Sequence, residues 1–280
     1  MSDQPILIER HEPIGIVTIN RPKVLNAIDV PTIRELERCF KQLADDNTVH
    51  VIVVTGAGDR AFVAGGDIGD LNSRQGLAHY LEFAETVHRA FRMIETCDKP
   101  TIGAINGWAL GGGAELLLAL DIRILADNAR LGLPEINLGL FPGAGGTQRL
   151  IRQVPLCRAK EIMFTGEPIS AEEAVAIGLA NRVVPREKLM EETLAVANRI
   201  SSKSPLILKL LKRALLHGGD MPLNAALPFE QTMISLVLDS RDAHEGCSAF
   251  LEKRKPQFTG HRHDGREAQS PHAEARLDHD

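Results

Sequence analysis

The chain has 280 residues, of which 44% are hydrophobic and 25% charged, as expected for a globular protein with one large domain or a core plus an appendage. Aromatic residues make up only 4%, which counts against carbohydrate clefts and base-stacking platforms. The 32 basic and 37 acidic residues give a net charge of −5, so no global field attracts phosphate backbones and nucleic acid is not an expected partner.

The first half of the chain alternates short apolar strands with helices. Asp29 is expected to cap a helix that runs to about residue 44. A glycine-rich loop is predicted from 56 to 69, and a helix with apolar residues at helical spacing follows it from 77 to 94. The run at 49–54 is typical of a strand buried on both faces. The predicted strands cover residues 6–8, 15–19, 49–54, 101–105 and 122–125.

The second half of the chain is mainly helical. Ser170-Ala171-Glu172-Glu173 is a capping-box sequence, and Gly178 stands where that helix is expected to end. Residues 183–185 suggest a last short strand. From 188 to 253 the pattern is helical, with breaks expected near Ser204-Pro205 and Gly218-Gly219.

These patterns divide the chain into a core at 1–200, a helical region at 201–259 and a tail at 260–280. The tail holds a single large aliphatic residue, so it cannot bury enough apolar area to offset the entropy of ordering, and we expect it to be disordered. Four histidines lie in the tail, but without fixed geometry they do not predict a metal site.

The cysteines and the apolar segments indicate the cellular compartment. No C-x-x-C pair exists, so zinc ribbons and thioredoxin motifs are excluded, and we expect the four thiols to be small buried hydrophobes in a reducing compartment. The N-terminus shows no secretory signal, and the most apolar segment, 108–120, is too short to span a membrane. We therefore expect a soluble cytoplasmic protein that does not contact a membrane.

Several common catalytic motifs are absent. The chain has no G-x-x-x-x-G-K-[ST], which excludes a P-loop NTPase, and no G-x-S-x-G, which argues against an α/β-hydrolase serine. It has no H-E-x-x-H, and its glycine clusters do not form a dinucleotide-binding G-x-G-x-x-G. The glycines must serve another purpose.

Two glycine-rich segments follow predicted strands, one around Gly65-Gly66 and one at 107–113. Glycines allow a ligand atom to approach backbone N–H groups closely. The run at 111–113 also lies at the start of a helix, where unpaired N–H groups favour negative charge. Two such donors converging on one oxygen would form an oxyanion hole. The alternative, that these glycines only permit tight turns and close packing, is left open by the residues alone.

Two glutamates stand alone in apolar surroundings. Glu115 lies in the first turn of an apolar helix, where a carboxylate is costly unless it is used or paired. Glu135 follows Pro134 and is also flanked by apolar residues. Such a pair suggests acid–base chemistry. The alternative for Glu115 is a favourable interaction with the helix dipole, and the sequence does not show that the two glutamates meet.

Five segments, taken together, resemble the enoyl-CoA hydratase/isomerase (crotonase) superfamily, and most closely its 2-enoyl-CoA hydratases. The resemblance runs in order over about residues 5–258. The segments are Asn20-Arg21-Pro22-Lys23-Val24-Leu25-Asn26-Ala27, Ala64-Gly65-Gly66-Asp67-Ile68, 106–116 (NGWALGGGAEL), Pro134-Glu135 with 142–150 (PGAGGTQRL), and Phe250-Leu251-Glu252-Lys253-Arg254-Lys255-Pro256.

The resemblance implies an α/β fold, a spiral of ββα units with a C-terminal helical trimerisation region. It implies a lyase of fatty acid metabolism that hydrates trans-2-enoyl-CoA to 3-hydroxyacyl-CoA and assembles as a homotrimer or a dimer of trimers. The partner molecule would be the acyl-CoA thioester, and no separate cofactor is expected because coenzyme A is part of the substrate.

The resemblance also implies roles for individual residues. The N–H groups of Gly66 and Gly112 would bind the thioester oxygen, and Glu115 and Glu135 match the two acid–base glutamates. The family often has a lysine where Gly69 stands here, which leaves Lys23 or a neighbouring subunit's Lys255 as candidates for the CoA phosphates. The implied substrate-binding positions are Lys23, Val24, Ala64, Asp67, Ile68, Gly69, Gly143 and Lys255.

For hydration, we assign Glu115 to activate water and Glu135 to protonate C2, and the sequence leaves the reverse assignment open. A rival within the superfamily is an enoyl-CoA isomerase or another CoA-thioester reaction; because isomerases of the family commonly work with a single acid–base residue, two glutamates favour hydration. A rival of another class is an RNA-binding family member, against which the net charge of −5 argues.

Overall fold

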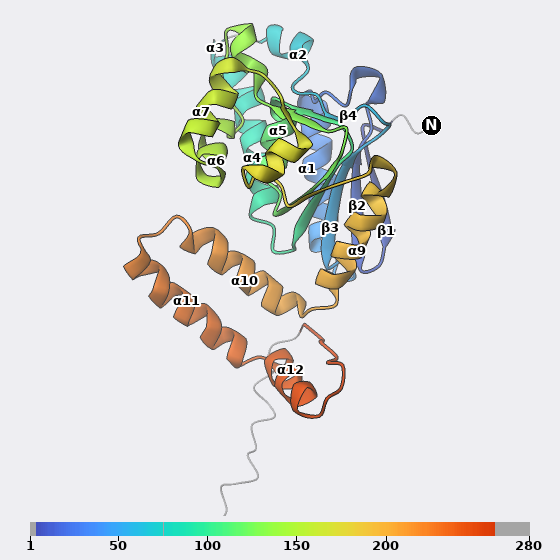
Figure 1. Cartoon of the computed structure of the whole chain (residues 1–280), viewed down its shortest axis with the longest axis vertical. Coiled ribbons are helices and arrows are strands. Elements are labelled where there is room, and N and C mark those ends of the chain that lie inside the picture. Colours follow the sequence, from blue (N-terminus) through green and yellow to red (C-terminus); the bar gives the residue numbers. More distant parts are fainter. Residues whose placement is uncertain (1–3, 75, 261–280) are drawn as a thin grey trace, which may run out of the picture. The chain divides into compact units, whose positions relative to one another are not determined.

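Strands and helices alternate along the first 200 residues of the chain (Figure 1). The computed structural model describes residues 4–74 and 76–260, which fall into two units divided between Ser202 and Lys203. The strands of the first unit are β1 (Ile6–His11), β2 (Ile14–Ile19), β3 (Val51–Gly56), β4 (Ala61–Val63), β5 (Thr101–Ile105), β6 (Trp108–Leu110), β7 (Ile122–Ala126), β8 (Arg130–Gly132), β9 (Ile169–Ser170) and β10 (Arg182–Val184).

Nine α-helices lie between and after these strands in the described part of the first unit. They are α1 (Val30–Asp45), α2 (Ile68–Asn72), α3 (Gly76–Ala78), α4 (Glu85–Glu95), α5 (Gly112–Leu118), α6 (Gly146–Gln153), α7 (Leu156–Thr165), α8 (Ala171–Ala176) and α9 (Leu189–Ser201). Short 3-10 turns occur at η1 (Pro22–Val24), η3 (Pro134–Leu138) and η4 (Arg186–Lys188), and a π-helical segment at η2 (His79–Ala84).

Two sheets share these strands. The larger has the order β1-β2-β3-β5-β7-β10, and the smaller has the order β4-β6-β8-β9. Each of the pairs β3/β4, β5/β6 and β7/β8 sends its first strand to the larger sheet and its second to the smaller one, and a helical segment follows each pair. All of these strands run parallel within their sheets. The predicted α/β class is confirmed, and the repeated unit is a strand, a second strand and a helix.

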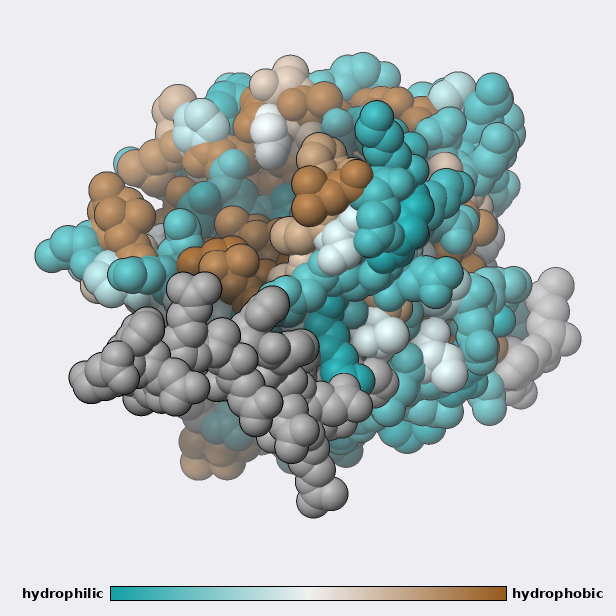
Figure 2. Space-filling model, turned by 90° about the horizontal axis from the view of Figure 1, so that it is seen from below, coloured by the Kyte–Doolittle hydropathy of each residue, from teal (hydrophilic) through white to brown (hydrophobic). Residues whose placement is uncertain are grey.

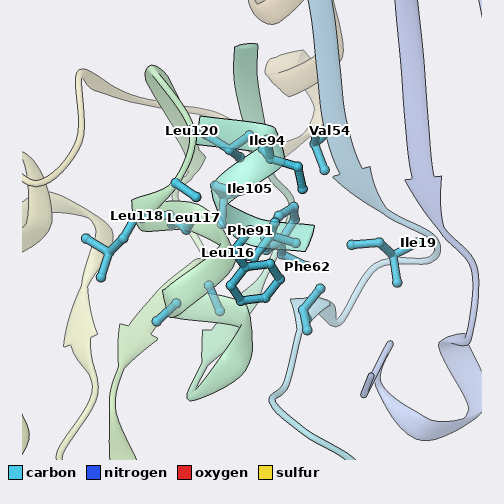
Figure 3. Close-up of a cluster of buried hydrophobic side chains, with 14 of the residues drawn as sticks. Ile19, Val54, Phe62, Phe91, Ile94, Ile105, Leu116, Leu117, Leu118 and Leu120 are labelled. Carbon is cyan, nitrogen blue, oxygen red and sulfur yellow. The ribbon is translucent and has the colours of Figure 1, made fainter. Parts of the chain in front are cut away.

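Strand β3 of the larger sheet is buried on both faces, as the apolar run at 49–54 predicts. Ile52 and Val54 belong to the main hydrophobic cluster, which includes residues of α1, α4 and α5, whereas Val51 and Val53 belong to a second cluster with residues of α9. In Figure 3, Leu116, Leu117 and Leu118 of α5 lie among the side chains of the main cluster. Burial of these leucines fixes α5, so the residues at its start are held in place.

Several local predictions are confirmed by the structure. The Asp29 side chain accepts a hydrogen bond from the Thr32 amide at 2.8 Å and so caps α1. The Ser170 hydroxyl accepts one from the Glu173 amide at 3.1 Å at the start of α8. Gly178 lies two residues beyond the end of α8 in a left-handed conformation, with φ of +81°.

Two predictions need correction. The segment 56–69 is not only a loop, because β4 and the start of α2 lie inside it. The helix predicted from 77 is a regular α-helix only from Glu85, since α3 and the π-helical η2 precede it. A π-turn inserts one extra residue, so the apolar spacing does not continue on one face. Leu77 and Leu81 are exposed accordingly, whereas Val87 and Phe91 are buried.

The second unit consists of α10 (Pro205–Gly218), α11 (Leu223–Leu238) and α12 (Arg241–Leu251). The breaks expected near Ser204 and Gly218 are confirmed, and a third break before the Ser240 cap of α12 was not predicted. Beyond α12, the Gly260 amide donates a hydrogen bond to Asp242 at 3.0 Å. The rest of the predicted tail, 261–280, lies outside the described residues.

Large apolar side chains are exposed on α10, α11 and α12. None of the residues of α11 is buried, although Ala226, Phe229 and Met233 are half-buried. Hydrophobic patches also occur between hydrophilic ones on the face of the molecule drawn in Figure 2. The exposed side chains of the second unit include Leu211, Leu215, Leu223, Leu227, Ile234, Leu236, Leu238, Phe250 and Leu251.

No disulfide joins the four cysteines, all of which lie in the described part of the chain. Cys39 and Cys97 are buried as predicted, but Cys157 and Cys247 are exposed, which corrects the expectation that all four are buried. Within residues 4–74 and 76–260, no group of three or more His, Cys, Asp or Glu side chains could hold a metal ion. No helix in the same residues is long and apolar enough to cross a membrane.

Candidate active site

The two glycine-rich segments lie against each other in the structure. Gly66 forms a parallel bridge with Ile28, whose amide donates to the Gly65 carbonyl at 2.9 Å and whose carbonyl accepts from the Asp67 amide at 2.8 Å. A Cβ atom on Gly112 would lie 3.5 Å from the Gly66 nitrogen. Among the described residues, neither the Gly66 nor the Gly112 amide has a hydrogen-bond acceptor in the protein. Two unused N–H donors therefore stand side by side.

The glycines around these donors are required by the packing. Gly111 has a φ of +49°, in the left-handed region, and precedes the first residue of α5. A Cβ on Gly113 would collide with the backbone carbonyl of Val63 in β4. The start of α5 and the end of β4 thus meet backbone to backbone at Gly113, and glycine is required on both sides of Gly112.

Glu115 lies one turn into α5 and is buried, with 2% of its surface exposed. Its Oε1 accepts hydrogen bonds from the amides of Ala144 at 2.7 Å and of Gly146 at 2.8 Å. Burial raises the pKa of Glu115 above its usual value, while these two amides and the positive charge of Arg149 act to lower it. The carboxyl group is therefore held in one orientation by backbone donors.

Glu135 lies at the start of η3, directly after Pro134. Its Oε1 lies against Gly111, since a Cβ there would be 3.0 Å away. Its Oε2 is buried and has no hydrogen-bond partner among the described residues. Burial, and secondly the charge of Glu115, raise the pKa of Glu135 to about 7. The two glutamates are thus close enough to interact, and one carboxyl oxygen of Glu135 is left without a protein partner.

Two apolar side chains border Gly66. A Cβ on Gly66 would lie 3.1 Å from Cδ1 of Leu71 and 3.8 Å from Cζ of Phe83. Leu71 belongs to α2 and Phe83 to η2, and both are half-buried. The sequence does not predict either residue at the site: Leu71 follows the segment predicted as a glycine-rich loop, and Phe83 lies within the segment predicted as a regular helix.

The implied CoA-contacting positions at Lys23-Val24 and at 64–69 come from two segments that are joined by a backbone hydrogen bond. The Ala64 amide donates to the Leu25 carbonyl at 3.1 Å, which joins the segment at 64–69 to the turn that carries Lys23 and Val24. Lys23, Val24, Ile68 and Gly69 are exposed.

The side chain of Asp67 is already engaged within the protein. It accepts hydrogen bonds from the amides of Gly69 at 3.0 Å and Asp70 at 3.2 Å, and its other oxygen lies 3.6 Å from Arg21. Gly143 is exposed next to the buried Ala144. Lys255 is exposed in the second unit.

Comparison with known proteins gives a family and several relatives. A family model described as Enoyl-CoA hydratase/isomerase matches residues 9–261. The chain is 41% identical over 258 residues to a crotonyl-CoA hydratase of Syntrophomonas wolfei, covering 92% of this chain and 99% of that protein. It is 40% identical over 250 residues to a short-chain-enoyl-CoA hydratase of Clostridium acetobutylicum, covering 89% and 95%.

The fold also matches solved structures. A crystal structure of an enoyl-CoA hydratase from Bacillus anthracis has a TM-score of 0.89 and 37% sequence identity, covering 92% of this chain and all of that one (100%). An enoyl-CoA hydratase subunit from Geobacillus kaustophilus has a TM-score of 0.87 and 40% identity, covering 92% and 99%.

Proposed function

The chain belongs to the enoyl-CoA hydratase/isomerase family, and we propose that it hydrates short-chain trans-2-enoyl-CoA thioesters, such as crotonyl-CoA, to 3-hydroxyacyl-CoA. One observation carries the proposal. Two carboxyl groups with unlike surroundings, the buried Glu115 and the half-buried Glu135, lie beside a pair of backbone amides that have no acceptor among the described residues. Names of relatives at about 40% identity support the choice of a short acyl chain.

The amides of Gly66 and Gly112 would form the oxyanion hole. As water adds at C3, electron density moves onto the thioester oxygen, and two preorganised N–H donors stabilise that charge without moving a proton. The adjacency of the two glycines supports this role. Losing one such donor typically costs about 3–4 kcal/mol of barrier.

Glu115 would accept a proton from water, and Glu135 would protonate C2. Burial raises the pKa of Glu115, and two amide hydrogen bonds oppose that rise, because an N–H group donates to carboxylate and cannot accept from it. The raised pKa of Glu135, to about 7, suits a group that must carry a proton near neutral pH. The unlike surroundings of the two carboxyls support this division of roles.

Coenzyme A would enter as part of the substrate, with no separate cofactor. Its pantetheine chain would run between the turn at Lys23-Val24 and the segment at 64–69, where Val24 and Ile68 are 45% and 54% exposed. Ala64, Gly69 and Gly143 would border this path. The Asp67 side chain would shape the path rather than touch the substrate, because its hydrogen bonds cap α2.

Hydration is separated from isomerisation by the fate of solvent oxygen. Purified protein is incubated with crotonyl-CoA in heavy-oxygen water, and the product is analysed by mass spectrometry. We expect 3-hydroxybutyryl-CoA with one labelled oxygen. Conversion of a 3-enoyl-CoA to the 2-enoyl isomer with no uptake of label, and no hydration of crotonyl-CoA, would show an isomerase instead.

The oxyanion role is tested by Gly112→Val. A Cβ at Gly112 meets only ordinary contacts, at 3.5 Å from Gly66 N and from Ile28, so the variant is expected to fold. Its side chain would fill the space that the thioester oxygen needs, so turnover of crotonyl-CoA should fall by at least ~10², matching one lost donor. Circular dichroism and thermal melting check the fold, and wild-type turnover in a folded variant would remove Gly112 from the site.

Assembly as a homotrimer, or as a dimer of trimers, is part of the same proposal. The row of exposed apolar side chains on α10 and α11 supports it, since a monomer would leave that surface in water. Lys255 would then be available to a neighbouring subunit's CoA phosphates. Analytical ultracentrifugation at micromolar concentration should show a trimer or hexamer, and a monomer would contradict this part of the proposal.

A further inference from the structure

The turn at Ala144–Gly146 touches Glu115 on one side and a half-buried arginine on the other. Its amides donate to Oε1 of Glu115, and the Ala144 carbonyl accepts a hydrogen bond from Nη1 of Arg149 at 3.1 Å. A Cβ on Gly145 would collide with the same guanidinium, so Arg149 packs directly on the Cα of Gly145. Nothing in the proposed chemistry uses Arg149.

Arg149 is itself held in a fixed position. Its Nε and Nη2 donate to the two carboxylate oxygens of Glu95 at 2.9 and 2.8 Å, which is the bidentate arrangement of a strong ion pair. The two side chains are 12% and 26% exposed. Glu95 is the last residue of α4, which packs in the main hydrophobic cluster, so the pair ties the turn to a rigid part of the core.

We propose that Arg149, held by Glu95, is a positioning residue for the hydration reaction: it fixes the turn at Ala144–Gly146, whose amides orient the carboxylate of Glu115. The inference rests on the proposed role of Glu115. Arg149 does not touch the reacting atoms and acts through the turn. Its positive charge also favours the ionised form of Glu115, which is the form that accepts a proton from water.

The charged groups that act on Glu115 come from two elements, Arg149 of α6 and Glu135 of η3. The strands β4 and β6, which also pack against α5, contribute no titratable side chain to it. Arg123, at the other end of α5, is engaged by carbonyls of the C-terminal turn and of Leu179. A change at Arg149 or Glu95 should therefore be read out at Glu115.

The first test compares Arg149→Met with Arg149→Lys. Arg149→Met removes the guanidinium group with its hydrogen bonds and its charge. We expect kcat to fall about 10- to 100-fold, because the carboxylate of Glu115 is misplaced. KM should change little, because the substrate path is intact. The acid limb of the kcat–pH profile should move to higher pH, since the pKa of Glu115 rises. Arg149→Lys keeps the charge, so its acid limb should stay near that of wild type while kcat recovers only in part.

Glu95→Gln should shift the acid limb of the kcat–pH profile in the opposite direction. It provides a second test if Arg149→Met does not fold. With Glu95 neutral, the charge of Arg149 is less compensated, so the acid limb should move to lower pH. Arg89→Met is the matched control: Arg89 lies on α4 and makes a bidentate pair with Glu37 at 2.8 and 3.0 Å, away from the turn. It should leave kcat and the pH profile unchanged.

A substrate-free measurement separates failure of this inference from failure of the proposed function. The pKa of Glu115 is followed by NMR in protein with isotope-labelled glutamate, its signal being assigned with Glu115→Gln. We expect it to rise in Arg149→Met and to fall in Glu95→Gln even if no enoyl-CoA is turned over. A folded Arg149→Met with wild-type kcat and an unmoved Glu115 pKa would overturn the inference while leaving hydration intact.

Discussion

Glu115 and Glu135 carry the same carboxyl group but differ in the hydrogen-bond partners and charges around it. Glu115 is covered by a helix, a turn and an arginine–glutamate pair, and one of its oxygens accepts two amide hydrogen bonds. Glu135 lies on a short 3-10 turn, and its Oε2 is buried without a partner among the described residues. The same functional group is thus anchored in one place and left free to accept or donate a proton in the other.

This difference explains how two carboxyl groups at one site could divide acid and base roles. Burial raises the pKa of both carboxyl groups. At Glu115 two amide hydrogen bonds and the charge of Arg149 oppose that rise, whereas at Glu135 the negative charge of Glu115 adds to it. Unlike surroundings of this kind are how one site can hold a carboxyl that donates a proton beside one that accepts it.

The largest expected effect comes from removing either carboxyl group. Glu115→Gln and Glu135→Gln should each lower kcat for crotonyl-CoA hydration by at least ~10², the lower end for a lost acid–base group. The double variant should be little worse than the poorer single one, because groups that act as a unit are not additive. Steady-state kinetics check this, with CoA-thioester binding measured by calorimetry.

Binding should persist in all three variants, because Gln keeps the side-chain volume and leaves the Gly66 and Gly112 amides untouched. If Glu135→Gln abolishes activity and Glu115→Gln is as active as wild type, the assignment of a proton-transfer role to Glu115 is wrong. Glu115 would then be only a buried carboxyl that ties α5 to the turn at Ala144–Gly146.

The second prediction concerns the backbone next to each glutamate, at Gly146 beside Glu115 and at Gly139 after Glu135. A Cβ on Gly146 would lie 3.0 Å from Oε1 of Glu115 and 2.8 Å from Cβ of Pro142, so Gly146→Ala must displace the carboxylate or the turn. Because a shift of about 1 Å in a catalytic group can cost 10²-fold, we expect kcat to fall about 10- to 100-fold.

The matched control is Gly139→Ala. Gly139 follows the last residue of η3, the turn that carries Glu135. Nothing lies within 4 Å of its Cβ position, but its φ of +71° disfavours a side chain. We expect a loss of about 1–2 kcal/mol in the free energy of unfolding, with kcat close to that of wild type. Urea unfolding measures the free energy, and steady-state kinetics measure kcat. Equal losses of kcat in Gly146→Ala and Gly139→Ala would contradict the stronger anchoring of Glu115.

The sequence predicts the parts of this arrangement that depend on local patterning. The β-branched run at 49–54, the Asp29 cap and the breaks at Ser204 and Gly218 all follow from side chains near in the sequence, and the structure confirms each of them. The isolation of Glu115 and Glu135 among apolar neighbours also marks them as unusual without any structure.

The features that the sequence does not predict depend on contacts between distant residues. Glu95 and Arg149 are 54 positions apart, and neither stands out by its neighbours, so their pairing is visible only once α4 and α6 are placed. The strand β4 is only three residues long and is hidden among glycines. The π-helical η2 has no pattern that distinguishes it from an α-helix, so the sequence does not predict the exposure of Leu81.

The third prediction uses the pH dependence of kcat/KM. Since Glu135 must carry a proton to act as the acid, and its pKa is raised to about 7, activity should fall as the pH rises through about 7. This alkaline limb should be absent from the residual activity of Glu135→Gln. If the limb survives in that variant, another group supplies the proton and the assignment of Glu135 is wrong.

The smallest effect concerns stability. The pKa of Glu135 is raised from 4.5 in the unfolded chain to about 7 in the folded one, so its contribution to stability is fully present below pH 4.5 and is lost as the pH rises through about 7. At pH 8, Glu135→Gln should therefore be more stable than wild type, by at most about 3 kcal/mol, and the difference should vanish below pH 4.5. Glu172→Gln is the control, because hydrogen bonds at the start of α8 lower the pKa of Glu172, and its removal should slightly destabilise the protein above pH 4.5. Urea unfolding across this pH range measures both variants, and a Glu135→Gln variant that gains no stability at pH 8 would show that the folded protein accommodates the ionised Glu135 without cost.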